Sequence, residues 1–350
     1  MITVFTPSFA DDDNTNAQNL TVKEVMARLD PSRFRVVMLG SSALDPRIAA
    51  RPNTQILAWR SRGNTAKVLW RLLTHTPDVY FFPREGPLDT AFLAARRRLS
   101  LKTALVVYVV SGAVESAAGS VFLRAIRECD LVAGNSRRMT KTVEKLGGKD
   151  VQTVYDGIDR RYYYPGSAPR NTQARKRVLF AGSFRPYKRA DLVVREAARF
   201  PQWEFRLAGT GEQESVCRKL ARDSGCTNVQ FLGHLNAAQL GEEMRQAQLF
   251  FFPSEIEGHP QVLGQAAACG LPCIARSSYD PDYVVNGVTG WLANSDDQLS
   301  AALAQMTSDS NLRSQMSAAA IKHAEKFEWH GIAKQWAELM EKAIVQRKNH

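Results

Sequence analysis

Short runs of apolar residues alternate along the chain with longer segments in which apolar residues recur at helical spacing. The apolar runs of the first half are residues 2–5, 34–38, 55–58, 79–82, 104–110, 131–133 and 151–154, and those of the second half are residues 178–181, 205–208, 229–232, 249–252 and 272–275. Most of these runs are continuously apolar, which indicates strands covered by helices on both faces. The alternation of strand and helix predicts a doubly wound parallel sheet, and this pattern occurs twice.

A segment rich in proline, glycine and serine separates the two series of strands. Residues 164–171 show no apolar periodicity, which is typical of a linker. We therefore predict an N-terminal domain over residues 1–168 and a second domain over residues 169–328. The final segment, residues 329–350, carries one apolar stripe and is predicted to form a helix that packs back on the N-terminal domain. The two domains are expected to face each other across a cleft at the carboxyl ends of both sheets.

The amino-acid composition limits the classes of protein to which the chain can belong. Of the 350 residues, 44% are hydrophobic and 23% are charged, as in ordinary globular proteins. The strongest apolar run, residues 103–110, is shorter than the roughly 18 residues that a membrane helix needs. The N-terminus carries no basic leader, and the five cysteines lack the spacing of a disulfide framework or zinc site. These features predict a cytoplasmic protein, and the net charge of +11 favours an anionic partner.

The second half contains a predicted helix start next to a carboxylate. Pro260 suits the first helical position, so the backbone N–H groups that follow it would form an anion site. Glu257 lies in the loop before this start, and Gln265 lies on the first turns of the helix. A carboxylate beside an anion site is favourable when it accepts hydrogen bonds from ligand hydroxyls, as in a sugar. A capped core helix with a solvated Glu257 explains the same residues, and the helix signals alone leave both interpretations open.

Two further loops follow buried strands in the same half. Gly182 allows close approach of the backbone, and Arg185 and Lys188 place positive charges at the strand end, which favours phosphate binding. Taken alone, this loop is more typical of an exposed basic helix start. Gly209 and Gly211 follow the next strand, although such a pair is weak evidence by itself. Together the three loops predict nucleotide binding at the carboxyl edge of the second sheet.

Other chemistries find no support in the sequence. It contains neither a GxxxxGK[ST] phosphate loop nor a GxGxxG at the start of either half, which disfavours an NTPase and a dinucleotide-dependent oxidoreductase. The six histidines are scattered, so no metal site is predicted. No nucleic-acid-binding motif accompanies the positive charge, so nucleic acid is not expected as a partner.

The second half contains three longer motifs, at residues 252–260, 266–275 and 286–292. These motifs resemble those of the retaining GT-B glycosyltransferases of group 1, family 4. Residues 132–136, 154–159, 178–188 and 231–233 fit the same family, and the resemblance fades before about residue 130. It implies an α/β protein with two doubly wound, Rossmann-like domains in the GT-B arrangement.

The resemblance implies a nucleotide-diphosphate sugar, UDP- or GDP-linked, as the donor, with no metal ion and no other cofactor. Lys188 matches the family's diphosphate-binding lysine, and Glu257 matches the first glutamate of an E-x7-E motif that contacts the donor sugar. With Arg185 they form the implied catalytic set, which would stabilise the leaving diphosphate electrostatically. The implied donor-binding residues are Gly182, Ser183, Gly209, Gly211, Gly233, His234, Gly258, His259, Pro260, Gln261, Val262, Leu263 and Gln265.

Several positions depart from the family's pattern. The second glutamate of the motif is Gln265, which keeps an acceptor oxygen but no charge. Ser183 replaces an arginine, whose charge Arg185 is expected to supply. The first loop carries acidic and amide residues in place of glycines, and these either hold acceptor hydroxyls and amines or cap the next helix. The implied acceptor-side residues are Asp12, Asn14, Thr15, Asn16 and Ser111, the last of which stands where the family has a histidine.

The sequence thus predicts a retaining glycosyltransferase that moves a hexose to a saccharide or lipid-linked acceptor. A catalytically weak GT-B-like binding or partner subunit is the alternative, because Gln265 and Ser183 replace charged residues of the family. Aromatic and basic residues at positions 59–62, 70–71 and 96–98 suggest peripheral contact with an anionic membrane. A solvated basic helix face explains them equally well.

Overall fold

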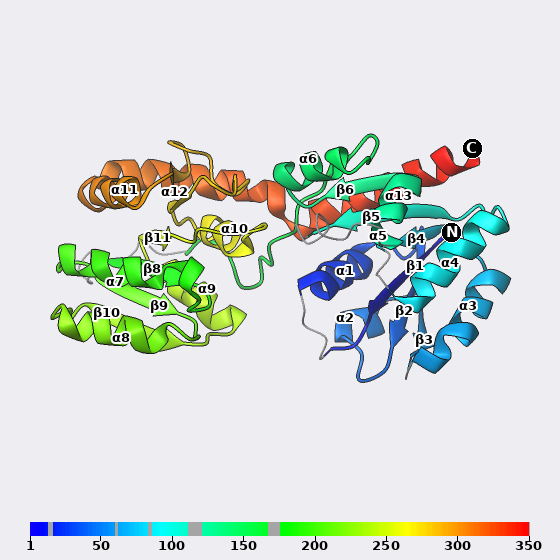
Figure 1. Cartoon of the computed structure of the whole chain (residues 1–350), viewed down its shortest axis with the longest axis horizontal. Helices are drawn as coiled ribbons and strands as arrows, with labels where there is room; N and C mark the ends of the chain where they lie inside the picture. Colours follow the sequence, from blue (N-terminus) through cyan, green and yellow to red (C-terminus); the bar gives the residue numbers. More distant parts are fainter. Residues whose placement is uncertain (13–16, 60–61, 83–85, 111–120, 167–175, 350) are drawn as a thin grey trace. The chain divides into compact units, whose positions relative to one another are not determined.

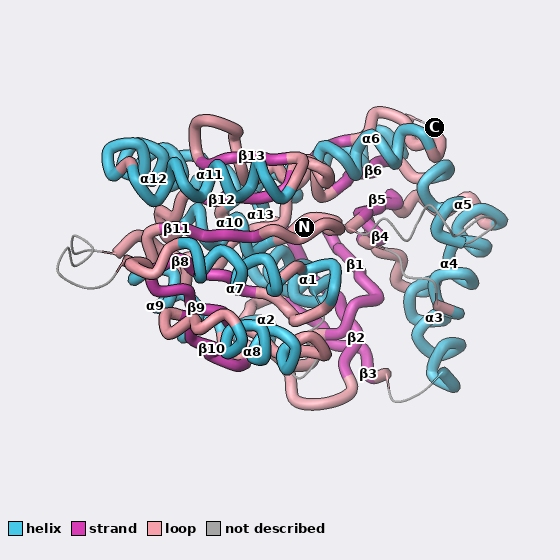
Figure 2. The backbone as a smooth tube through the Cα atoms, turned by 60° about the vertical axis from the view of Figure 1, so that its left-hand side comes forward, coloured by secondary structure: helices cyan, strands magenta, loops and turns pink. Residues whose placement is uncertain are grey.

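The computed structural model describes residues 1–12, 17–59, 62–82, 86–110, 121–166 and 176–349. The chain divides into two compact units, Met1–Gly157 with Trp329–His350, and Ile158–Glu328. Each unit contains one sheet of parallel strands joined by helices (Figures 1 and 2). The prediction of two doubly wound parallel-sheet domains is confirmed.

The first unit has a seven-stranded sheet in the order β3-β2-β1-β4-β5-β6-β7. The strands are β1 (Ile2–Phe9), β2 (Phe34–Gly40), β3 (Thr54–Ala58), β4 (Val79–Phe81), β5 (Ala104–Val109), β6 (Leu131–Gly134) and β7 (Gln152–Thr153). Helices α1 (Ala17–Arg28), α2 (Pro46–Ala49) and α13 (Trp329–Lys348) contribute to the core on one face. Helices α3 (Thr65–Thr74), α4 (Pro87–Arg98), α5 (Val121–Glu128) and α6 (Arg137–Lys145) contribute to the core on the other.

Strands β4 and β5, near the middle of this sheet, contain only aliphatic and aromatic residues because both of their faces are covered. Val106 and Tyr108 of β5 belong to the core beneath α13, whereas Leu105 and Val107 belong to the core beneath α4 and α5. All residues of β5 are buried. A strand buried on both faces cannot alternate apolar and polar residues, which is why the apolar runs of the sequence predicted this sheet.

The last helix of the chain packs on the first unit. Figure 1 shows α13, in red, beside β5 and β6, and these elements are in contact. The Trp336 ring lies edge-on against Phe81 and Tyr108, with ring centroids 4.9 Å apart in both pairs. Trp329 begins the helix directly against Gly157, where an added Cβ would lie 2.2 Å from the indole ring. The apolar stripe of this helix therefore belongs to the core of the first unit.

The boundary between the units falls after Gly157, earlier than the predicted position at residue 168. The residues in between are held by the second unit. The Ile158 N–H donates to the Phe327 carbonyl at 2.6 Å, and the Arg245 guanidinium donates to the Tyr162 carbonyl at 2.8 Å. These partners lie far away in the sequence, so local composition gave no sign of them.

The second unit has a six-stranded sheet in the order β10-β9-β8-β11-β12-β13. The strands are β8 (Arg177–Ala181), β9 (Glu204–Ala208), β10 (Val229–Gly233), β11 (Leu249–Phe252), β12 (Cys273–Arg276) and β13 (Gly290–Ala293). The helices are α7 (Ala190–Arg199), α8 (Glu214–Asp223), α9 (Ala237–Gln246), α10 (Gln261–Ala268), α11 (Asp296–Ser308) and α12 (Ser310–Ala324), with short 3-10 turns at η3 (Pro186–Lys188) and η4 (Glu325–Phe327). Among the described residues, no helix is both long enough and apolar enough to cross a membrane.

Candidate functional site

A pocket of about 440 Å³ lies in the second unit, where β8, β9, β10 and β11 end and α10 begins. Sequence-predicted residues that line it are Gly182, Ser183, Lys188, Gly209, His234, Glu257, Pro260, Gln261, Val262 and Gln265. Further lining residues, which the sequence did not single out, are Ala181, Ala208, Thr210, Leu235, Leu240 and Phe252. The pocket therefore lies at the carboxyl edge of the sheet, where parallel α/β sheets bind ligands.

Glycines bring the strand ends close together on one side of the pocket. Gly209 has φ +130°, and a Cβ added to it would lie 1.9 Å from the Gly182 carbonyl oxygen. The Gly209 N–H donates to the Gly233 carbonyl at 2.7 Å, and the Gly182 N–H donates to the Ala208 carbonyl at 3.0 Å. Gly211 makes a similar close approach, because an added Cβ would lie 2.8 Å from backbone atoms of Phe184. These loops interlock through the backbone, which is why they require glycine.

Lys188 and Glu257 form an ion pair in the wall of the pocket. Lys188 ends η3, and its Nζ contacts Oε1 of Glu257. The Ser254 hydroxyl donates to the same oxygen at 2.6 Å. The Lys188 ammonium also lies 5.3 Å from the centroid of the Phe252 ring, within the range of a cation–π contact. The structure therefore brings the two principal candidate residues together, with one cation suited to phosphate and one carboxylate suited to hydroxyl groups.

The start of α10 supplies backbone donors to the same pocket. Its N-cap residue is Pro260, whose side chain cannot accept a hydrogen bond from the first turn. The Leu263 N–H donates to the Pro260 carbonyl at 3.0 Å and Leu263 is buried, so this residue does not contribute the free donor that the sequence suggested. Gln261 and Val262 line the pocket, and their N–H groups have no acceptor among the described residues. Together with the helix dipole they favour an anion at this position.

Other predicted donor-side residues lie around the pocket. Arg185 is exposed at the start of η3 and is not among the described residues that line the pocket. The His259 ring packs on Tyr283, with centroids 4.4 Å apart. Gly233 and Gly258 have open space, because an added Cβ would meet no described atom within 4 Å.

The candidate acceptor-side residues lie in the first unit or outside the described part of the chain. Asp12 is exposed, and its N–H donates to the Ala43 carbonyl at 2.8 Å. Asn14, Thr15, Asn16 and Ser111 lie outside the described residues. The neighbouring Asp11 is buried, and its carboxylate accepts hydrogen bonds from the Ser41 N–H at 2.9 Å and the Ser41 hydroxyl at 2.7 Å. Burial raises the pKa of Asp11, but these hydrogen bonds outweigh it and hold the pKa below its usual value. Asp11 thus ties two loops of the first unit together.

Within the described residues, no group of three or more His, Cys, Asp or Glu side chains is arranged to hold a metal ion. The charged groups that line the pocket are instead Lys188 and Glu257. A ligand of this pocket would therefore meet one ammonium, one carboxylate and the donors of a helix N-terminus.

The second unit matches a known family. Residues 168–323 match the family described as glycosyl transferases group 1. D-inositol 3-phosphate glycosyltransferase of Rhodococcus erythropolis is 30% identical over 254 residues, which are 65% of this chain and 57% of that protein. A GDP-mannose-dependent monoacylated alpha-(1-6)-phosphatidylinositol monomannoside mannosyltransferase of Corynebacterium glutamicum is 29% identical over 196 residues, 49% of this chain and 51% of that protein. The chain thus spans little more than half the length of these curated relatives.

The fold of the whole chain also has counterparts among solved structures. The crystal structure of Anabaena HepE in complex with UDP has a TM-score of 0.77 and 17% sequence identity, and the match covers 97% of this chain and 100% of that one. This likeness shows the fold, which is the GT-B fold of two parallel-sheet domains. Residues 168–323 are thus similar to the glycosyl transferases group 1, and the chain has the GT-B fold.

Proposed function

We propose that this chain is a retaining, metal-independent hexosyltransferase that moves a hexose from a UDP- or GDP-linked sugar to a saccharide or lipid-linked acceptor. The observation that carries the proposal is the Lys188–Glu257 pair in a pocket that also contains the N-terminus of α10. The match to glycosyl transferases group 1 supports the reaction class. One relative is named as GDP-mannose-dependent and one structural neighbour is a complex with UDP, which supports a nucleotide sugar as donor.

In this proposal each charged group of the pocket has a role in the reaction. The donor diphosphate lies against Lys188 and the N–H groups of Gln261 and Val262, and Glu257 accepts hydrogen bonds from hydroxyls of the donor sugar. The bond between the anomeric carbon and the diphosphate oxygen breaks, and the acceptor oxygen bonds to that carbon on the same face. The departing diphosphate takes the acceptor's proton. Catalysis is therefore stabilisation of the negative charge that develops on the leaving group. Arg185, on the same turn, is the proposed second cation.

Gln265 is expected to bind the donor more weakly than a glutamate at the same position would. Gln265 lines the pocket from α10, and a neutral amide oxygen accepts weaker hydrogen bonds than a carboxylate does. Each lost charge-assisted bond to the donor ribose weakens binding by about 1 kcal/mol. A catalytically weak binding or partner subunit is the alternative function that this residue and Ser183 support. The two functions differ in whether the wild-type chain turns over a nucleotide sugar.

Thermal unfolding with nucleotides tests whether the pocket binds a donor. UDP, GDP, ADP and their common sugars are added to separate samples at about 100 times the expected Kd. A ligand that binds only the folded chain at this excess stabilises it by about 2.7 kcal/mol. For a folding unit of this size the shift is about 2–4 °C per kcal/mol, so one base should raise Tm by about 5–10 °C. If no nucleotide changes Tm, the donor-site proposal is contradicted and the result favours the partner-subunit alternative.

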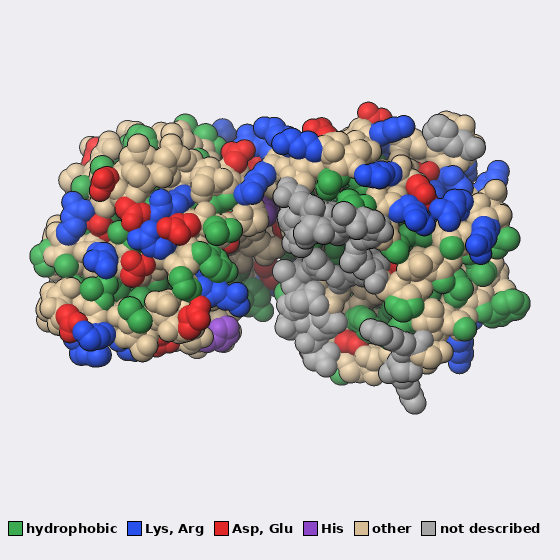
Figure 3. All heavy atoms as spheres, viewed as in Figure 1, with side chains coloured by type: hydrophobic (Ala, Val, Ile, Leu, Met, Phe, Trp, Pro, Cys, Tyr) green, Lys and Arg blue, Asp and Glu red, His purple; other side chains and the backbone are tan. Residues whose placement is uncertain are grey.

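We also propose that the first unit makes peripheral contact with an anionic membrane. Trp70 of α3 is 70% exposed beside Lys67 and Arg71, and Leu99 is 61% exposed after the basic end of α4. Figure 3 shows Lys and Arg side chains gathered on the visible face of the first unit. Arg96 does not contribute to this surface, because it is buried and its guanidinium donates to the Thr103 carbonyl at 2.8 Å.

Sedimentation with vesicles tests this contact. We expect the chain to bind vesicles that contain anionic lipid, with binding that weakens as salt screens the charges. Replacing Trp70 with serine should weaken binding at constant charge. If binding at low salt is the same with and without anionic lipid, the proposed contact is wrong.

A further inference from the structure

The residue that follows Lys188 has an unusual backbone conformation. Arg189 lies between η3 and α7 with φ 54° and ψ 42°, in the left-handed region. A residue with a Cβ is disfavoured in this region, and glycine is not. Such a conformation persists where surrounding contacts hold it in place, and it is enriched at functional sites. The contacts of the Arg189 side chain hold this residue in the left-handed conformation.

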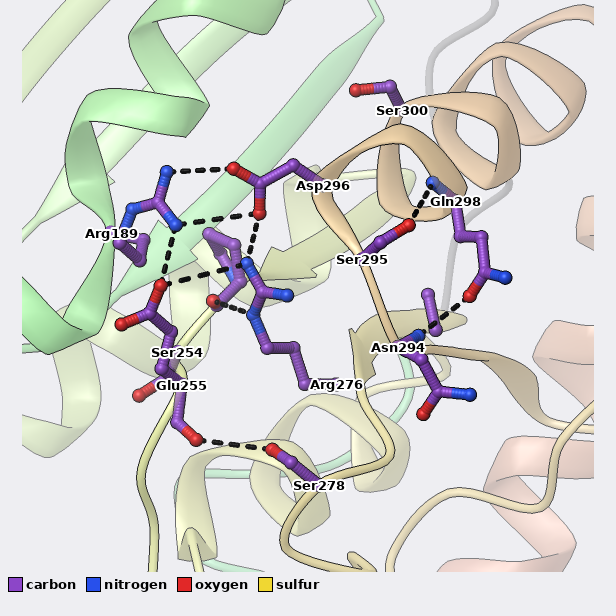
Figure 4. Close-up of polar contacts among 12 residues, drawn as sticks. Arg189, Ser254, Glu255, Arg276, Ser278, Asn294, Ser295, Asp296, Gln298 and Ser300 are labelled. Atoms are coloured by element: carbon purple, nitrogen blue, oxygen red, sulfur yellow. Dashed lines mark hydrogen bonds and ion pairs between the residues drawn. The ribbon is translucent and has the colours of Figure 1, made fainter.

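The Arg189 guanidinium contacts three carboxylates, and Figure 4 shows two of them, those of Glu255 and Asp296. It donates to Oε1 of Glu255 at 2.6 Å and to Oδ2 of Asp296 at 2.8 Å. Its Nε donates to Asp191 at 3.2 Å. The side chain of Arg189 is 22% exposed, so these ion pairs are partly shielded from water. Asp296 is the first residue of α11, where a carboxylate is also favoured by the helix dipole.

A second arginine completes the network on the other side of the same carboxylates. The Arg276 guanidinium pairs with Asp296, lies 4.0 Å from Glu255, and donates to the Pro253 carbonyl at 3.0 Å. Figure 4 shows Arg189 and Arg276 on either side of these two acidic residues. We call Arg189, Glu255, Arg276 and Asp296 the arginine brace. It joins β12 and α11 to the two loops that carry Lys188 and Glu257.

The brace is connected to the pocket by the backbone of these two loops. The Glu255 N–H donates to the carbonyl of Tyr187, the residue before Lys188, at 2.8 Å. The Ser254 hydroxyl donates to Glu257 at 2.6 Å, and Ser254 precedes Glu255. Lys188 is thus fixed by Tyr187 on one side and by Arg189 on the other. Of the described residues that line the pocket, none belongs to the brace.

We propose that the arginine brace is a positioning device for the donor site. Its ion pairs hold Arg189 in the left-handed conformation, and this conformation directs Lys188 towards Glu257 and the pocket. The brace residues act through Lys188 and Glu257 and do not themselves touch the ligand. The expected effect on donor binding rests on the function proposed above. The expected effect on the orientation of Lys188 does not.

Alanine and glycine at position 189 distinguish positioning from plain stabilisation. Arg189→Ala and Arg189→Gly both remove the guanidinium, but glycine adopts the left-handed conformation without strain and alanine does not. We expect Arg189→Ala to raise the Kd of the nucleotide that stabilises the wild type by about tenfold, a change of about 1.4 kcal/mol. Arg189→Gly should stay within about threefold of the wild type. Equal losses in both variants would overturn the proposal, because the side chain would then matter for its charge alone.

A second pair of variants tests Asp296 in the same way. Asp296→Asn should raise the nucleotide Kd several-fold in the wild-type background. In the Arg189→Gly background it should leave the Kd unchanged, because the backbone no longer depends on the ion pair. Non-additivity of this kind is the mark of residues that act through one another. Equal effects in both backgrounds would contradict the brace as a positioning device.

Reductive methylation of lysines, read by mass spectrometry, needs no nucleotide. Lys188 is paired with Glu257 and its side chain is 15% exposed, so it should react slowly in the wild type and in Arg189→Gly. In Arg189→Ala it should react about tenfold faster, while the exposed Lys219 provides the reference rate in every variant. If the wild type binds no nucleotide, the proposed function is contradicted. The labelling pattern then still tests whether the arginine brace positions Lys188. Unchanged labelling of Lys188 in Arg189→Ala would overturn the inference.

Discussion

Replacing Lys188 with alanine is expected to lower kcat/KM for sugar transfer by about 10³-fold. The Lys188 ammonium lies in the pocket wall against Glu257, beside the donors at the start of α10. Removing a single preorganised donor from a site of developing negative charge costs about 10²–10³ in kcat, and a full charge contributes more than a neutral donor. The measurement is the rate of nucleoside diphosphate release, with the donor that thermal unfolding identifies.

Two controls separate catalysis from folding in this experiment. Lys188→Arg keeps the charge but changes its geometry, so it should recover only part of the rate. Lys219→Ala removes an exposed lysine of α8, 70% exposed, and should leave the rate unchanged. A Lys188→Ala variant that stays within tenfold of the wild type would contradict the proposed role. A partner subunit, by contrast, would show no turnover of a nucleotide sugar in the wild type.

Much of the fold could be predicted because its signals are local. Strands such as β5 are apolar at every position since both of their faces are buried. The apolar residues of α13 recur at helical spacing, so they form one stripe along the helix. The boundary between the units could not be placed from such signals. The sequence predicts a linker at residues 164–171, but the boundary falls after Gly157. Ile158 and Tyr162 are held by Phe327 and Arg245 from distant parts of the chain.

Some residues of the candidate site could be predicted from local sequence motifs, whereas others depend on contacts with distant parts of the chain. Lys188 and Glu257 could be found because each lies in a short motif after a buried strand. The apolar part of the pocket could not, because Leu235 and Leu240 are indistinguishable from core residues in the sequence. Arg189 looks like an ordinary surface charge at a helix start. Its left-handed backbone depends on Asp296 and Glu255, which no local pattern reveals.

Replacing Gly209 with alanine is expected to destabilise the second unit by about 3 kcal/mol or more. A Cβ at this position would lie 1.9 Å from the Gly182 carbonyl oxygen, and the φ of +130° is disfavoured for alanine. Steric overlap with the backbone and a forbidden φ each cost about 1–3 kcal/mol. The neighbouring strands cannot move apart without losing the hydrogen bonds that join Gly182 to Ala208 and Gly209 to Gly233. Thermal unfolding should show a Tm lowered by about 10 °C.

Two other glycines separate the steric part of this effect from the conformational part. Gly258→Ala meets open space at an ordinary φ, so it should leave Tm unchanged. Gly233→Ala also meets open space but has φ +68°, so it should cost only the strain of the left-handed region, about 1 kcal/mol. The Tm should therefore be highest for Gly258→Ala, lower for Gly233→Ala and lowest for Gly209→Ala. A Gly209→Ala variant as stable as Gly233→Ala would mean that the ends of β8 and β9 can separate. The interlocked strand ends would then not be what shapes the pocket.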